Sequence, residues 1–248
     1  MDYIDMNAKT IDRWVEGGWE WGKPVSHEVY EAALAGSWSV VLTAVKPVPK
    51  EWFFPMKGCR ILGLAAGGAQ QMPVFAALGA KCTVLDYSKK QLESERAMAR
   101  QEGYEIQIVR ASMTDPLPFE DGSFDLIFHP VSNCYIEKVE PVWRECYRVL
   151  RPGGRLLAGM DNGINYIVDE TEKRIVHRLP FNPLKDRALM EELEKENGGV
   201  QFSHTMEEQL RGQLKAGFRL LDLYEDTNGS GYLHEMGIPS FWASLAEK

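Results

Sequence analysis

The sequence lacks the features of a secreted, membrane-spanning or metal-clustering protein. Its 248 residues include only four cysteines, no two of which form a C-x-x-C pair, and no histidine stands near one at zinc-finger spacing. No apolar run approaches the roughly 18 residues of a membrane span. The residues after Met1 are acidic where a signal peptide carries bases. We therefore predict a cytoplasmic protein with free thiols, no metal site and no membrane contact.

Basic residues are also scarce. The chain has 28 Lys and Arg against 36 Asp and Glu, a formal net charge of −8. An acidic surface repels phosphate backbones, so we expect no nucleic-acid partner. Hydrophobic residues make up 44% and charged residues 26%, the balance of an ordinary globular protein. The length suits one large domain, or one domain with a modest insertion.

Apolar strands alternate with helical segments from residue 58 onward. Strands are predicted at 60–64, 81–85, 105–110, 124–128, 155–160 and 218–224, with a last strand at 240–245 antiparallel at the sheet edge. Helices are predicted at 8–16, 27–35, 70–78, 88–101, 137–150, 185–197 and from about 203 to 215. Parallel strands that are apolar on both faces require helices on both sides. The prediction is an α/β fold: a Rossmann-like, doubly wound, mostly parallel sheet with helices on both faces and an antiparallel edge strand.

Two segments are additional to this core. Residues 1–57 are rich in tryptophan and proline and form an N-terminal segment before the domain at 58–248. Its tryptophans, Trp14, Trp19, Trp21 and Trp38 among them, either dock the segment on the core or cap the active site; both interpretations are open. Residues 161–202 form an insertion or lid, with a β-hairpin predicted at 166–168 and 174–177.

A Gly/Ala-rich turn at 65–69 follows the first strand and precedes a helix. Such a turn lets a ligand approach the backbone and the helix N-terminus closely. Asp86 ends the next strand, 19 positions after Gly67, where a carboxylate can accept hydrogen bonds from a ribose diol. The turn is neither G-x-G-x-x-G nor a Walker loop. It ends in Gln70 and Gln71, whose amides suit a zwitterionic amino-acid group better than a phosphate.

Four segments share an order and spacing: Arg-Ile-Leu-Gly-Leu-Ala-Ala-Gly-Gly at 60–68, Leu-Asp-Tyr-Ser at 85–88, Pro-Phe-Glu-Asp-Gly-Ser-Phe-Asp-Leu-Ile at 118–127 and Arg-Val-Leu-Arg-Pro-Gly-Gly at 148–154. Together they resemble the class I S-adenosylmethionine-dependent methyltransferases, strongly over 58–160 and weakly over 218–245. A subgroup with a Leu-Ala-Ser-Gly-Gly-Gly-Gln-Gln loop and a His-Pro-Val-Ser-Asn-Cys-Tyr segment is the most similar. This chain has Leu-Ala-Ala-Gly-Gly-Ala-Gln-Gln at 64–71 and the second segment at 129–135.

The resemblance implies S-adenosylmethionine as cofactor and a small molecule as methyl acceptor. The residues that it implies for cofactor binding follow the strand ends and the helix after the second strand: Ala65, Ala66, Gly67, Gln71, Asp86, Tyr87, Ser88, Gln91, Ser112, Met113, His129 and Pro130. On the acceptor side it points to His129, Asn133 and Tyr135, which orient the substrate or, for His129, act as a base. A lone histidine beside an apolar strand is more often a packing residue, so both roles are open.

Three departures from the family pattern leave other functions open. Gly63 stands where an acid usually binds the cofactor's amino group, and Ser112 stands where an Asp usually accepts from adenine. Ala65 and Ala69 replace loop glycines, which we expect the chain to tolerate if their φ angles stay negative. Alternatives are therefore a non-catalytic module that binds S-adenosylmethionine or S-adenosylhomocysteine and, less favoured, a nicotinamide-dependent oxidoreductase.

Overall fold

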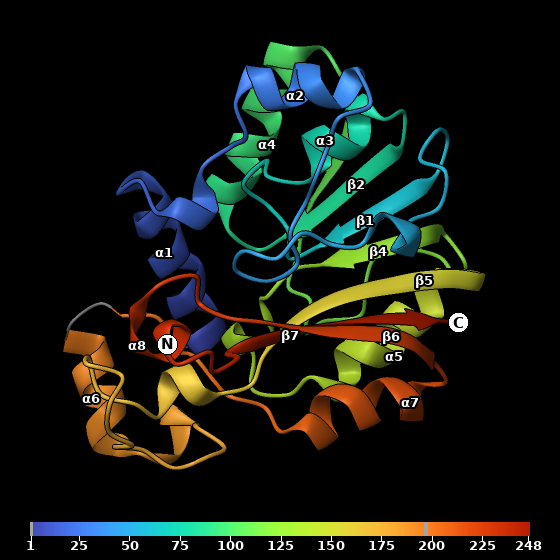
Figure 1. Cartoon of the computed structure of the whole chain (residues 1–248). Coiled ribbons are helices and arrows are strands. Elements are labelled where there is room, and N and C mark those ends of the chain that lie inside the picture. Colours follow the sequence, from blue (N-terminus) through green and yellow to red (C-terminus); the bar gives the residue numbers. More distant parts are fainter. Residues whose placement is uncertain (1, 196–197) are drawn as a thin grey trace.

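A seven-stranded sheet forms the centre of the molecule, whose computed structural model describes residues 2–195 and 198–248 (Figure 1). The strand order is β3-β2-β1-β4-β5-β7-β6, with bounds β1 Arg60–Leu64, β2 Lys81–Asp86, β3 Ile106–Arg110, β4 Phe124–His129, β5 Leu150–Asp161, β6 Arg219–Asp226 and β7 Phe241–Glu247. Neighbours from β3 to β5 are parallel, and β7 is antiparallel to both β5 and β6. The predicted fold class is confirmed. Within it, the last strand of the chain lies one place inside the edge, and β6 is the edge strand.

Both faces of the sheet are covered, and alternate side chains of the central strands β1 and β4 enter two separate hydrophobic cores. Ile61 and Phe128 belong to the first core, and their neighbours Leu62 and Ile127 to the second. The helices divide accordingly: α3 (Met72–Ala77) and α4 (Lys89–Glu102) contribute to the first core, α5 (Glu140–Val149) and α7 (Gly212–Ala216) to the second. This two-sided burial explains the continuous apolar strands that indicated a parallel sheet.

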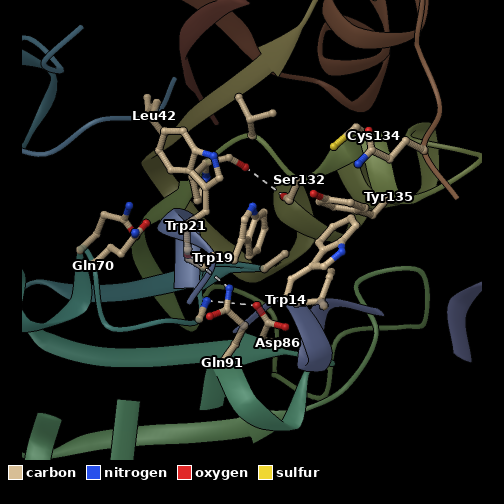
Figure 2. Close-up of a pocket in the computed structure, with 18 of the residues that line it drawn as sticks. Trp14, Trp19, Trp21, Leu42, Gln70, Asp86, Gln91, Ser132, Cys134 and Tyr135 are labelled. Atoms are coloured by element: carbon tan, nitrogen blue, oxygen red, sulfur yellow. Dashed lines mark hydrogen bonds between the residues drawn. The ribbon is translucent and has the colours of Figure 1, made fainter. Parts of the chain in front are cut away.

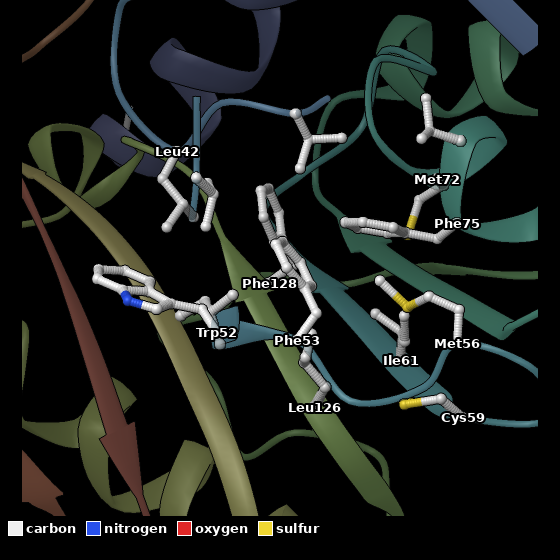
Figure 3. Close-up of a cluster of buried hydrophobic side chains, with 14 of the residues drawn as sticks. Leu42, Trp52, Phe53, Met56, Cys59, Ile61, Met72, Phe75, Leu126 and Phe128 are labelled. Carbon is white, nitrogen blue, oxygen red and sulfur yellow. The ribbon is translucent and has the colours of Figure 1, made fainter. Parts of the chain in front are cut away.

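The N-terminal segment has two parts. Its first part contains α1 (Tyr3–Glu16), η1 (Glu20–Gly22) and α2 (His27–Leu34), and α1 lies beside α4 (Figure 1). The second part, which includes η2 (Lys50–Trp52), packs into the first core through Leu42, Trp52 and Phe53 (Figure 3). Trp38 also packs there, with its ring 5.2 Å from that of Phe53. The aromatic side chains Trp38, Trp52 and Phe53 of this second part therefore belong to the core rather than to a cap.

The segment at 161–202 contains η4 (Ile164–Tyr166), η5 (Pro183–Lys185) and α6 (Arg187–Lys195). The predicted hairpin is wrong, because only one isolated antiparallel bridge joins Val168 to Ile175. The Ile175 side chain is 74% exposed. Because it packs against no apolar surface, it does not stabilise a longer ladder of paired residues. The predicted helix at 185–197 corresponds to α6, and its last two residues lie outside the described part of the chain.

The remaining differences concern helix ends. Helix α1 begins at Tyr3 rather than near residue 8, because the Asp2 side chain accepts a hydrogen bond from Ile4 N and caps it. The helix predicted from about 203 begins as a π-helix at Glu207–Arg211 before α7, and α8 (Gly231–Glu235) has no predicted counterpart. Among the helices of residues 2–195 and 198–248, none combines the length and apolarity that a membrane crossing requires.

Candidate active site

The turn between β1 and α3 contains residues in the left-handed backbone conformation that glycine normally adopts. Ala65 and Ala69 have φ angles of +49° and +56°, so the condition of negative φ, under which we expected alanine to be tolerated, is met at neither. Hydrogen bonds from outside the turn fix this conformation. Ala65 N donates to Leu85 O at 2.8 Å, and Ala69 N donates to the buried carboxylate of Glu95 at 2.7 Å. The left-handed conformation is therefore imposed by neighbouring elements.

Asp86 ends β2 and faces this turn. Its Oδ2 accepts a hydrogen bond from Gly67 N at 3.1 Å, and its Oδ1 accepts one from Ser88 N at 2.9 Å. Burial raises the pKa of Asp86 to about 6, although these N–H donors oppose the rise. A Cβ on Gly67 would lie 3.0 Å from Asp86 Oδ2 and 2.7 Å from Gln91 Cβ, so only glycine allows this approach. The spacing of 19 residues therefore corresponds to a direct contact.

A cavity of about 610 Å³ opens beside this contact, at the carboxyl ends of the strands (Figure 2). Most residues that the resemblance implies for the cofactor line it: Ala65, Ala66, Gly67, Gln71, Asp86, Tyr87, Gln91, Met113 and Pro130. Since β1 and β4 are adjacent, the cavity lies where the strand order reverses, the usual ligand position in such sheets. The charged side chains among its described lining are Asp86 and Arg13.

Three expected cofactor ligands do not line the cavity: Ser88, Ser112 and His129. Ser88 instead caps α4, accepting a hydrogen bond from Gln91 N. The Ser112 hydroxyl pairs with Thr114 Oγ1 at 2.7 Å. Both serines therefore form hydrogen bonds within the chain, outside the residues that line the cavity.

His129 is buried, and each ring nitrogen lies near an oxygen atom, of which a neutral imidazole can donate to only one. Nδ1 lies 2.8 Å from Leu64 O and Nε2 lies 2.8 Å from Asn133 Oδ1. Burial lowers the pKa of the ring, which favours the neutral form. Asn133 is also buried, and its amide donates to Gln209 Oε1 at 3.0 Å. The geometry thus favours the packing interpretation of His129, with Asn133 as its partner rather than as a cavity residue.

Aromatic side chains form much of the opposite wall. Tyr135 lines the cavity as expected, and burial raises its pKa, so its phenol stays neutral. Trp14 lies against it, with ring centroids 6.4 Å apart, and against Trp19 at 5.3 Å (Figure 2). Trp21 lines the cavity as well. Each interpretation of the tryptophans therefore applies to different residues. Trp38 docks the N-terminal segment on the core, whereas Trp14, Trp19 and Trp21 line the cavity.

Sequence reasoning missed other parts of the wall, chiefly residues 41–44, Gln201 and Phe241. The segment at 41–44 reaches the site because Gly159 of β5 lets it approach. A Cβ on Gly159 would overlap the carbonyl oxygen of Leu42. Nothing in the local sequence of either segment signals this contact, which joins residues far apart in the chain.

The acid that the family pattern places at Gly63 has no space here. A Cβ on Gly63 would lie 2.8 Å from Met72 Cε and 2.9 Å from its Sδ. Met72 is completely buried at the start of α3. The end of the Met72 side chain therefore lies where a side chain at position 63 would begin. Within the described residues, no group of three or more His, Cys, Asp or Glu side chains could hold a metal ion.

The strand order and the cavity at the strand-order reversal define a Rossmann-like α/β protein with a ligand site. A methyltransferase-domain family model matches residues 62–158. The chain is 42% identical over 238 residues to the uncharacterized methyltransferase YbaJ of Bacillus subtilis (strain 168), covering 92% of this chain and 93% of that protein. The chain therefore belongs to this methyltransferase family, and the prediction of a methyltransferase is confirmed.

Solved structures of the same fold agree. An S-adenosylmethionine-dependent methyltransferase from Mesorhizobium loti matches with a TM-score of 0.63 at 22% identity, covering 80% of this chain and 95% of that one. A geranyl diphosphate methyltransferase in complex with S-adenosylmethionine matches with a TM-score of 0.56 at 16% identity, covering 79% and 81%. At such identities the likeness establishes the fold.

Proposed function

We propose that the protein transfers a methyl group from S-adenosylmethionine to a small-molecule acceptor bound in this cavity. The observation that carries the proposal is the buried Asp86 carboxylate in contact with Gly67 beside the cavity. Family membership supports the reaction, and the neighbour in complex with S-adenosylmethionine supports the cofactor. The loop at 64–71 and the segment at 129–135 support membership of the subgroup with those two motifs.

The adenosine half of the cofactor fits the side of the cavity near β2. Each Asp86 oxygen uses one lone pair on a backbone N–H, which leaves acceptor capacity for both ribose hydroxyls. Such hydrogen bonds favour the charged carboxylate and offset the cost of its burial. Tyr87 and Met113 line the cavity beside it and supply surface for adenine.

The amino-acid half of the cofactor requires polar partners. Position 63 is glycine, so no acid there can supply them. Gln70 is engaged elsewhere, because its amide donates to Glu20 O at 3.1 Å and Lys23 O at 3.3 Å. Gln71 is only 5% exposed and lines the cavity, and no hydrogen bond of its side chain is formed within residues 2–195 and 198–248. An amide at the cavity wall that has no partner in the described chain is available to a ligand. Gln71 is therefore the residue that binds the ammonium and carboxylate groups of the cofactor.

The bound cofactor supplies a methyl group already activated on a sulfonium. The tasks left to the protein are alignment and exclusion of water. Trp14, Trp19 and Tyr135 close the cavity for the second task. Because His129 does not face the cavity, it has no assigned role in proton transfer. The aromatic walls and the two charged lining residues favour a small, planar acceptor of low net charge.

The N-terminal part at 1–57 and the insertion at 161–202 are proposed to select the acceptor. Asn7 on α1 connects them, since its amide donates to Val200 O at 2.8 Å and its Oδ1 accepts from Val200 N at 2.7 Å. Tyr166 of the insertion lines the cavity. We also keep the cytoplasmic location as a proposal, which the four buried free cysteines support.

Titration calorimetry with S-adenosylmethionine, S-adenosylhomocysteine and NADH tests the proposed function. We expect micromolar binding of the first two and none of NADH. Binding of NADH alone would refute the assignment. Tight binding of S-adenosylmethionine without turnover over a broad acceptor panel would favour the non-catalytic binding module.

The assignment of Gln71 has a test of its own. 5′-Methylthioadenosine contains the ribose and adenine but lacks the amino-acid group. We expect Gln71→Ala to weaken S-adenosylhomocysteine about tenfold, the scale of hydrogen bonds to charged groups, and to leave 5′-methylthioadenosine within twofold. Helix α3 has no side-chain cap at Gln71, so the change spares the helix start. Gln101→Ala, the same change at an exposed position of α4, is the control and should alter neither affinity. An equal effect of Gln71→Ala on both ligands would contradict the role of Gln71.

A further inference from the structure

Asp12 of α1 is hydrogen-bonded to the first turn of α4. Its Oδ1 accepts from Ser88 Oγ at 2.6 Å and from Lys90 N at 3.0 Å. The first N–H groups of a helix have no partner within the helix, and negative charge is favourable there. A side chain from the N-terminal segment thus completes the cap of a core helix.

Ser88 joins this contact to the ribose site. Its backbone N–H donates to Asp86 Oδ1 at 2.9 Å, while its hydroxyl donates to Asp12. The same hydroxyl oxygen accepts from Gln91 N at 3.1 Å. Ser88 is completely buried, so water does not compete for these bonds. One residue therefore connects Asp12 of the N-terminal segment with the carboxylate that faces the cavity.

Asp12 also lies among wall residues. Its neighbours Ile11, Arg13 and Trp14 line the cavity from α1. The position of Asp12 over α4 thereby determines where this wall lies. A second tether, from Gln70 to the backbone of η1, holds the continuation of the segment to the turn after β1.

We propose that Asp12 is a positioning residue for methyl transfer, which couples the α1 wall to the ribose-binding carboxylate through Ser88. This inference rests on the proposed function. Tight binding at Asp86 then depends on α1 being docked, and the wall containing Trp14 closes over the cofactor only when the Asp12–Ser88 bond forms. Asp12 itself touches neither cofactor nor acceptor.

Calorimetry on the full chain tests this proposal. We expect Asp12→Ala to weaken S-adenosylhomocysteine and 5′-methylthioadenosine alike, each about tenfold, because both contain the ribose. Asp12→Asn should restore binding to within about twofold, since the amide oxygen accepts both bonds. Asp5→Ala, the same change at an exposed position of α1, is the control and should alter neither affinity.

A cycle with Ser88→Ala separates positioning from stability. If Asp12 acts through Ser88, the double variant binds S-adenosylhomocysteine no worse than the weaker single variant. Additive losses would refute the coupling. A lowered melting temperature with affinities unchanged would make Asp12 purely structural and would also refute it. If the wild-type protein bound no S-adenosylhomocysteine, the proposed function would fail, an outcome distinct from wild-type binding that Asp12→Ala leaves intact.

Discussion

Replacing Asp86 by asparagine should make the stability of the protein less dependent on pH. Burial raises the pKa of Asp86 from 3.8 to about 6 in the folded chain. A carboxyl with a raised pKa binds its proton more tightly in the folded state. The wild-type protein therefore loses stability as the pH rises from about 4 through 6, and this loss is complete above the folded pKa.

The magnitude follows from the two pKa values. A rise from 3.8 to about 6, at about 1.4 kcal/mol per pKa unit, corresponds to about 3 kcal/mol above pH 7. Asparagine does not ionise, so the variant avoids this loss. Its NH2 group faces one of the two backbone donors, Gly67 N or Ser88 N, which adds a cost that does not vary with pH.

Urea unfolding of both proteins at pH 4 and pH 7.5 measures the effect. We expect the free-energy difference between variant and wild type to move by about 2–3 kcal/mol toward the variant at the higher pH. Burial also raises the pKa of Glu95 to about 8 and of Asp161 to about 7, but these groups titrate in both proteins. A difference that is equal at the two pH values would refute the reasoning.

Two further predictions concern backbone geometry. Ala65→Gly should raise the free energy of unfolding by about 0.5 kcal/mol, because relief of the left-handed conformation exceeds the added freedom of the unfolded chain. Ala66→Gly, at a neighbour without positive φ, should lower the free energy of unfolding by about 1 kcal/mol. Equal losses for the two variants in urea unfolding would contradict this prediction. Gly159→Ala should cost about 3 kcal/mol or more, because the new methyl meets the Leu42 carbonyl of a second backbone segment; a melting temperature within 2 °C of wild type would be the contrary result.

The sheet and the position of Asp86 beside the Gly/Ala-rich turn could be predicted because their signals are local. Strands β1, β2 and β4 are short and mostly apolar, and Ile61 and Leu62 enter different cores as period-2 alternation requires. The contact of Asp86 with Gly67 follows from two adjacent parallel strands whose ends meet at one edge of the sheet. Neither inference depends on how distant segments fold onto the core.

The rest of the site depends on such distant contacts. Leu42 faces the cavity because Gly159, more than a hundred residues later, has no side chain. His129 is the last residue of β4, next to the cavity-lining Pro130, yet its ring turns to Leu64 O and Asn133. The direction of that ring is set by hydrogen-bond partners, and no spacing in the sequence encodes it.

The turn at 65–69 shows that the number of glycines in a segment underestimates how many of its residues adopt the left-handed conformation. Alanine in the left-handed region costs about 1–2 kcal/mol per residue, and two of them persist here. They persist because Leu85 O and the Glu95 carboxylate bind their N–H groups from β2 and α4. Conformational strain of this kind is retained where surrounding structure enforces it, and it concentrates at functional sites. The backbone shape that we propose receives the cofactor is thus encoded in the residues around the turn as much as in the turn itself.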